Sequence, residues 1–251
     1  MKAAILVIIS VFAFSSQAVA GWYRIENFEG LVGQRPVHFS IQRYDGFGSG
    51  ITVKGSYFYD DERKPIALYG KANGETLELC EIANDQEFRE KMIVGSKTPI
   101  DTAGCPFAIK VDATAMTGVR NDGKAAEAVT LKKVAALDDT SGGVITGAIQ
   151  IPFWAHNANH SFSGNYEKTA FGICMTTLRV IDRITGRVNQ EIRFKNEACD
   201  AGMVMTSIYQ NVETFVEDGA DIVVVNFKDG GMGYSRSFKF DAITRTFKQT
   251  D

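Results

Sequence analysis

The sequence has few of the residues that most often carry catalysis or metal binding. It contains three histidines, four cysteines, five prolines and two tryptophans in 251 residues. It has no H-E-x-x-H zinc motif, and the glycines around Ser49 do not have the spacing of a G-x-S-x-G nucleophile elbow. A glycosidase with two carboxylates is left open, because its acids need not be close in sequence. We therefore expect a protein that binds rather than an enzyme, with no cofactor and no metal.

The chain also lacks an excess of positive charge. Its formal net charge is −3, whereas a nucleic-acid-binding domain usually carries a basic patch or stripe. Hydrophobic residues make up 45% and charged residues 23%, which is the composition of a globular protein rather than a disordered one. No run beyond the N-terminal segment is apolar enough to cross a membrane. We expect neither a nucleic-acid partner nor a membrane span.

The N-terminal segment, MKAAILVIISVFAFSSQAVAG, has the pattern of a secretory signal peptide. A lysine precedes an apolar run over Ala3–Phe14, and Ala18-Val19-Ala20 forms an A-x-A cleavage site. Because no cysteine lies near the cut, a lipid anchor there is not expected. The pattern predicts that residues 1–20 are removed and that the protein is periplasmic or secreted.

The four cysteines are expected to form two disulfides in such a compartment. Four cysteines allow three pairings. The same spacing separates Cys80 from Cys105 and Cys174 from Cys199, so we favour these two local pairs. The absence of a C-x-x-C motif argues against a metal site made of these residues.

Strand-like segments cover most of the chain. Many alternate apolar and polar residues, as in PVHFSIQRY, and are joined by turn signals such as Asn73-Gly74. The expected strands lie at 22–28, 36–44, 51–59, 65–70, 75–82, 107–111, 127–134, 144–153, 175–182, 187–194, 212–217, 221–227 and 234–240. One short helix is expected over Asp85–Val94, capped by Asn84 or Asp85. The fold class is therefore all-β, with antiparallel meanders and at most one or two short helices.

The acidic, flexible segment Asp138–Gly143 is the best linker candidate. It divides the mature chain into an N-terminal β module, residues 21–138, and a C-terminal β module, residues 144–251. A single large sandwich or barrel is the alternative, since such folds can exceed 200 residues.

The stretch WAHNANHSFSGNYEKTAFG, Trp154–Gly172, shows neither strand nor helix periodicity. We predict a long polar and aromatic loop, and loops of this length are usually functional or disordered. His156 and His160 lie four residues apart, but no third ligand is marked by spacing, so we interpret them as loop histidines that form hydrogen bonds.

Two resemblances bear on function. The string VKGSYFYDDERKPIALYGKANGETLELCE, with GVRNDGKAAEAVTLKKV further on, is similar to a hairpin module of exported bacterial proteins of uncertain function. This resemblance implies a bacterial envelope protein and indicates no activity.

The second resemblance lies within the predicted loop. SGNY, residues 163–166, is similar to the S-G-x-Y loop of bacterial periplasmic lysozyme inhibitors. In that family the loop enters the enzyme's cleft, where its serine and tyrosine meet the catalytic groups. The resemblance implies that Ser163, Gly164 and Tyr166 form an inhibitory loop.

The leading hypothesis is therefore an exported inhibitor or immunity protein that blocks a lysozyme-like, peptidoglycan-cleaving enzyme. The runner-up is an envelope module that binds a glycan or another protein without inhibiting an enzyme. The residues expected to support the contact are Trp154, His160 and Phe162.

Overall fold

The computed structural model describes residues 23–47, 50–93, 100–140, 143–169, 172–194, 207–229 and 232–250. The predicted signal peptide and Cys199 lie outside these ranges. Within them the chain is almost entirely antiparallel β-structure with one short α-helix, so the all-β prediction is confirmed.

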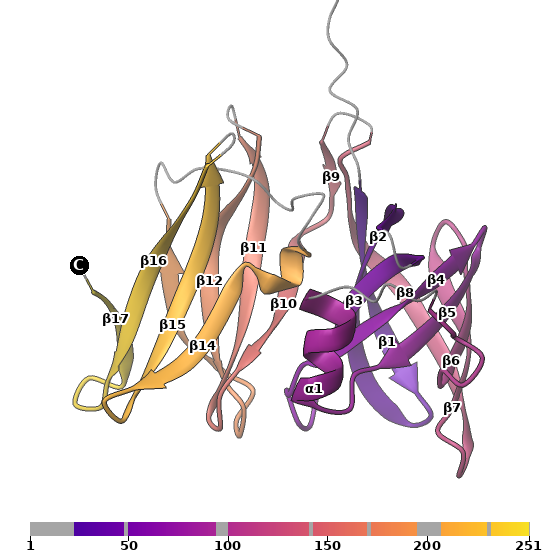
Figure 1. Cartoon of the computed structure of the whole chain (residues 1–251), viewed down its shortest axis with the longest axis horizontal. Helices are drawn as coiled ribbons and strands as arrows, with labels where there is room; N and C mark the ends of the chain where they lie inside the picture. The colour runs from indigo at the N-terminus through magenta and orange to yellow at the C-terminus, as the bar shows by residue number, and fades with distance from the viewer. Residues whose placement is uncertain are drawn as a thin grey trace, which may run out of the picture.

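The first nine strands form one sheet in sequence order, and pairing of β1 with β8 closes eight of them into a barrel (Figure 1). Val37, Phe39 and Ile41 point into the barrel and are buried, which is the face that the alternation in this segment predicts. The strands are β1 (Tyr23–Val32), β2 (Arg35–Phe47), β3 (Ile51–Tyr59), β4 (Ile66–Asn73), β5 (Thr76–Glu81), β6 (Phe107–Val111), β7 (Ala115–Asn121), β8 (Ala126–Asp138) and β9 (Val144–Thr146).

The remaining strands form two four-stranded antiparallel sheets. The sheets pack face to face, with ring contacts between them such as Phe162–Phe247 and Phe194–Phe227. We call this part the sandwich. Its strands are β10 (Ile149–His156), β11 (His160–Thr169), β12 (Gly172–Asp182) and β13 (Val188–Arg193) in one sheet, and β14 (Val212–Glu217), β15 (Ala220–Asp229), β16 (Met232–Asp241) and β17 (Thr246–Thr250) in the other.

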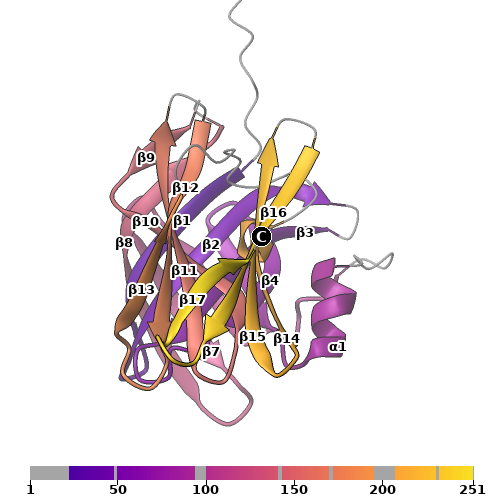
Figure 2. The same ribbon diagram turned by 90° about the vertical axis from the view of Figure 1, so that its left-hand side faces the viewer.

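The barrel and the sandwich lie side by side in Figure 1 and one in front of the other in Figure 2, and they share one hydrophobic cluster. That cluster joins Ile25 and Leu137 of the barrel to Ile151 and Tyr209 of the sandwich. The predicted linker falls between β8 and β9, and β9 pairs with β8, so the chain leaves the barrel sheet only after Thr146. The proposed division into modules at this segment stays a prediction.

The predicted short helix is present as α1 (Asp85–Phe88), which continues as a π-helical turn over Arg89–Ile93. Asn84 caps it, since its Oδ1 accepts a hydrogen bond from the Glu87 backbone N–H at 3.0 Å. The Phe88 ring meets Trp154 of β10 edge-on, with ring centroids 5.1 Å apart. The helix therefore contacts the sandwich from the barrel side.

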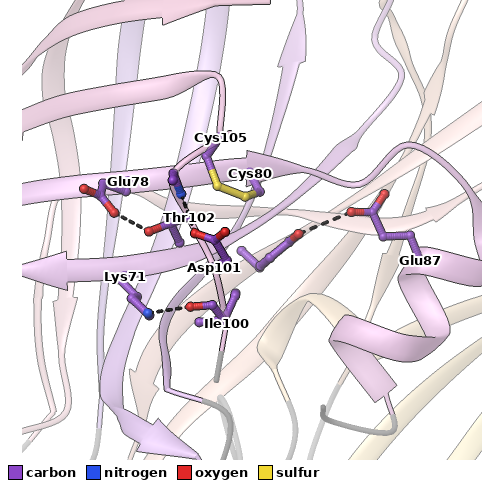
Figure 3. Close-up of a disulfide and its surroundings, with 10 residues drawn as sticks. Lys71, Glu78, Cys80, Glu87, Ile100, Asp101, Thr102 and Cys105 are labelled. Carbon is purple, nitrogen blue, oxygen red and sulfur yellow. Dashed lines mark hydrogen bonds between the residues drawn. A yellow bond between two sulfur atoms is a disulfide. The ribbon is translucent and has the colours of Figure 1, made fainter. Parts of the chain in front are cut away.

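One predicted disulfide, Cys80–Cys105, is observed and fastens β5 to the segment just before β6 (Figure 3). Around it, Lys71 donates to the Ile100 carbonyl oxygen at 2.5 Å, and Thr102 donates to the Glu78 carboxylate. The other predicted pair includes Cys199, which lies outside the described residues, so that pairing stays a prediction.

Candidate functional site

The prediction of a long loop at Trp154–Gly172 is wrong. Trp154 belongs to β10, Asn157 and Asn159 lie in a tight turn, and His160–Thr169 forms β11, an inner strand of its sheet. The turn is closed by the Asn157 side chain, whose Oδ1 accepts hydrogen bonds from the backbone N–H groups of Asn159 and His160. The sequence of this strand shows no alternation of apolar and polar residues because both of its faces are buried, one in the sandwich and one against the barrel.

The SGNY residues are consequently not on an exposed loop. Tyr166 is 3% exposed, and its hydroxyl accepts a hydrogen bond from Asn211 Nδ2 at 3.2 Å. Gly164 faces the sandwich interior, where a Cβ would lie 2.7 Å from the Phe153 ring. Ser163 is 6% exposed and points to the opposite side of the strand. The structure thus separates the three residues between two faces.

The three residues expected to support the contact are buried as well. Trp154 donates from Nε1 to the Gly55 carbonyl oxygen at 2.7 Å and stacks on Tyr209. Phe162 packs edge-on against Phe247. The His160 ring lies between Phe240 and Phe247, with centroids 5.3 and 5.4 Å away. Phe162 and His160 therefore serve the packing of the sandwich, and Trp154 serves its contact with the barrel.

Ser163 instead lines a pocket between the barrel and the sandwich. The pocket has a volume of about 260 Å³. Crevices between modules are a preferred location for ligand sites. Residues from β1, β2, β3 and the turn after β3 form one wall, and residues from β10, β11 and β12 form the other. We call it the interface pocket; the lining residues used below are Asn27, Glu29, His38, Phe58, Arg63, Ala148, Ser161 and Ser163.

Strand register explains the barrel wall of this pocket. Glu29 pairs with His38, and His38 with Phe58, so the three side chains form a row across the outer surface of the barrel. Two residues further along, Asn27 pairs with Ser40 in a parallel row. These rows are the polar face of strands whose other face fills the barrel interior.

Asn27 forms the deep end of the barrel wall and is 7% exposed. Its Nδ2 donates to the Gln150 carbonyl oxygen at 2.5 Å, and this contact fixes the orientation of the amide, because a carbonyl oxygen can only accept. The amide oxygen Oδ1 is buried and has no hydrogen-bond partner among the described residues. A buried polar atom without a partner usually costs about 1–3 kcal/mol.

The sandwich wall presents two hydroxyls. Ser161 and Ser163 alternate with Phe162 on β11, so both face the pocket while Phe162 also reaches the sandwich core. Both serines are nearly fully buried. A hydroxyl can donate and accept, so this wall can match either kind of polar atom on a ligand.

Charged and aromatic groups form the more open part of the pocket. His38 stacks on Phe58 with centroids 5.0 Å apart, and its two ring nitrogens lie 3.3 Å from Glu29 Oε1 and 3.0 Å from Asp60 Oδ1. Arg63 lies 3.6 Å from the same Asp60 oxygen and 5.5 Å from the centre of the Phe58 ring. The rim thus carries an Asp60–Arg63 ion pair, and the His38 ring contacts two carboxylates.

Arg63 adopts a left-handed backbone conformation, with φ of 54°. Its N–H donates to the Tyr59 carbonyl oxygen at 2.8 Å, and its Nε donates to the Asp60 carbonyl oxygen at 2.9 Å. A non-glycine residue in this region carries backbone strain, which persists where neighbouring contacts hold it. The turn thereby keeps the guanidinium over Phe58 at the rim.

Sequence reasoning missed the residues of the barrel wall, namely Asn27, His38, Phe58 and Arg63. The alternation in PVHFSIQRY places His38 and Ser40 on a polar face, but it does not show that a second module covers that face. The alternation of apolar and polar residues was present, but it is the same for a strand face exposed to solvent and for one buried at an interface.

Among the described residues, no group of three or more His, Cys, Asp or Glu side chains is arranged to hold a metal ion. No helix in that part of the chain has the length and apolarity needed to cross a membrane. Comparison of the chain with protein-family models, with curated proteins and with solved structures finds no match.

Proposed function

We propose that this chain is an exported binding protein that holds a small polar ligand in the interface pocket. The observation that carries the proposal is the interface pocket itself, whose sandwich wall presents the hydroxyls of Ser161 and Ser163. The signal-peptide pattern and the Cys80–Cys105 disulfide support export to a periplasmic or extracellular location. The geometry thus favours an envelope module that binds a ligand over an inhibitor that acts through the inhibitory loop.

Retention of a small molecule by the intact protein tests the proposal. The full chain is dialysed against the low-molecular-mass fraction of a bacterial envelope extract, washed and denatured, and the released compounds are identified by mass spectrometry. Ala148 is exposed at the edge of the pocket, so Ala148→Trp should close the pocket without disturbing the core.

We expect a compound that the wild type retains and Ala148→Trp does not. Ser235→Ala, in β16 of the other sheet, is the matched control and should retain the compound. Equal retention by wild type and Ala148→Trp would exclude the pocket as the binding site.

Inhibition of a lysozyme-like enzyme is kept as a second proposal, supported by the SGNY resemblance. Contact with an enzyme cleft through Ser163 and Tyr166 would require β11 to leave its sheet, because neither side chain is exposed. If the protein inhibits a muralytic enzyme, we therefore expect Ser163→Ala to inhibit as well as the wild type. Loss of inhibition with an unchanged melting temperature would instead show that Ser163 contacts the enzyme.

A further inference from the structure

We infer that the interface pocket takes a neutral, hydroxyl-bearing ligand about the size of one sugar ring. This inference rests on the proposed function, because it specifies the ligand of the same pocket. It follows from which polar atoms are buried in the pocket, which are already paired, and how much space they enclose.

The buried polar atoms of the pocket are all neutral. They belong to the Asn27 amide and to the hydroxyls of Ser161 and Ser163. An ionised ligand placed here would find no charge of opposite sign among these groups, and a buried unpaired charge is costly. A hydroxyl needs no such partner, because it can both donate to and accept from the serines.

The charged residues of the rim do not reverse this preference. Along the rim, His38 lies 3.3 Å from Glu29 and 3.0 Å from Asp60, and Asp60 lies 3.6 Å from Arg63. An ionic ligand would compete with these contacts for the same charged groups, whereas a neutral ligand leaves the contacts intact.

The size and the apolar part of the lining agree with a single ring. A volume of about 260 Å³ lies just below the range of roughly 300–1,000 Å³ that is typical of small-molecule sites. Pro65, Pro152 and Ile181 line the pocket beside the polar atoms. A sugar ring offers both surfaces, since its C–H groups can pack on such residues while its hydroxyls point to the serines.

Ligand-observed saturation-transfer NMR on the full chain tests this inference with four probes. N-acetylglucosamine and glucose are neutral, glutarate is an anion, and cadaverine is a cation. We expect saturation transfer to at least one neutral sugar and to neither ion. Ser161→Ala and Ser163→Ala should each weaken sugar binding about threefold, and Ala148→Trp should abolish it, while Ser235→Ala should leave it unchanged.

The outcomes separate the two levels of the proposal. Binding of an ion that Ala148→Trp abolishes, without binding of either sugar, would overturn the neutral-ligand inference and leave the pocket as the site. Sugar binding that survives Ala148→Trp, or no binding by any probe, would overturn the inference as stated, and the dialysis experiment then decides whether the pocket binds anything. Ser163→Ala keeps the test valid if Ala148→Trp does not fold, because no hydrogen bond to the Ser163 hydroxyl is observed among the described residues.

Discussion

At the scale of single residues, Gly164 shows why β11 has the sequence it has. The strand crosses the sandwich where Phe153 and Met175 already fill the space, and an added Cβ would lie 2.7 and 2.8 Å from them. Only a residue without a side chain fits there. Gly164, which the sequence places in the predicted inhibitory loop, is instead required by close packing in the core.

Gly164→Ala should therefore destabilise the fold. Overpacking of a filled core typically costs about 1–3 kcal/mol, and we expect a loss of this size in the free energy of unfolding measured by urea denaturation. Gly104→Ala is the matched control, because a Cβ at that exposed turn would meet nothing within 4 Å. Equal stability of the two variants would contradict the packing described for β11.

At the scale of elements, β11 begins at His160, whose buried ring faces charges from three other segments. Asp182 ends β12, Asp221 lies at the start of β15, and Arg245 lies in the turn before β17. Burial lowers the pKa of His160 below its ordinary value of about 6.5, because the charged form loses hydration, and the two carboxylates only partly oppose this effect.

This lowered pKa predicts a loss of stability on acidification. The unfolded chain binds the His160 proton more tightly than the folded chain does, so the free energy of unfolding falls as the pH drops from about 6.5 towards the lowered pKa. Urea denaturation between pH 7.5 and 5 measures this slope. His160→Gln should flatten the slope, although the variant is also less stable at every pH because it loses ring contacts. An unchanged slope would show that His160 does not titrate in this way.

At the scale of the whole molecule, the barrel and the sandwich meet through polar as well as apolar side chains. The Ser40 hydroxyl of the barrel and the Tyr209 hydroxyl of the sandwich lie 2.9 Å apart and are both buried. Gln42 Oε1 accepts hydrogen bonds from Ser207 Oγ and the Ile208 N–H, each at 3.2 Å. These contacts fix the separation of the two parts, and with it the width of the interface pocket.

A double-mutant cycle on Ser40→Ala and Tyr209→Phe should detect this connection. Each single variant leaves one buried hydroxyl unpaired, whereas the double variant leaves none, so we expect a coupling of about 1 kcal/mol in the free energy of unfolding. Ser40→Ala combined with the distant Ser235→Ala should be additive within about 0.5 kcal/mol. Additivity of the first pair would mean that the hydroxyls do not interact across the interface.

The sequence by itself determined most of the strands, the short helix with its Asn84 cap, and the Cys80–Cys105 pairing, but not β17 or the break between β9 and β10. Each of these depends on local alternation, capping chemistry or spacing, which neighbouring residues carry. Only the tertiary structure decided that β11 is a strand and that Asn27, His38 and Ser163 meet in one pocket. Alternation shows which side chains share a face of a strand, but it does not show what covers that face. Here the polar face of the barrel is covered by a sandwich more than a hundred residues further along the chain.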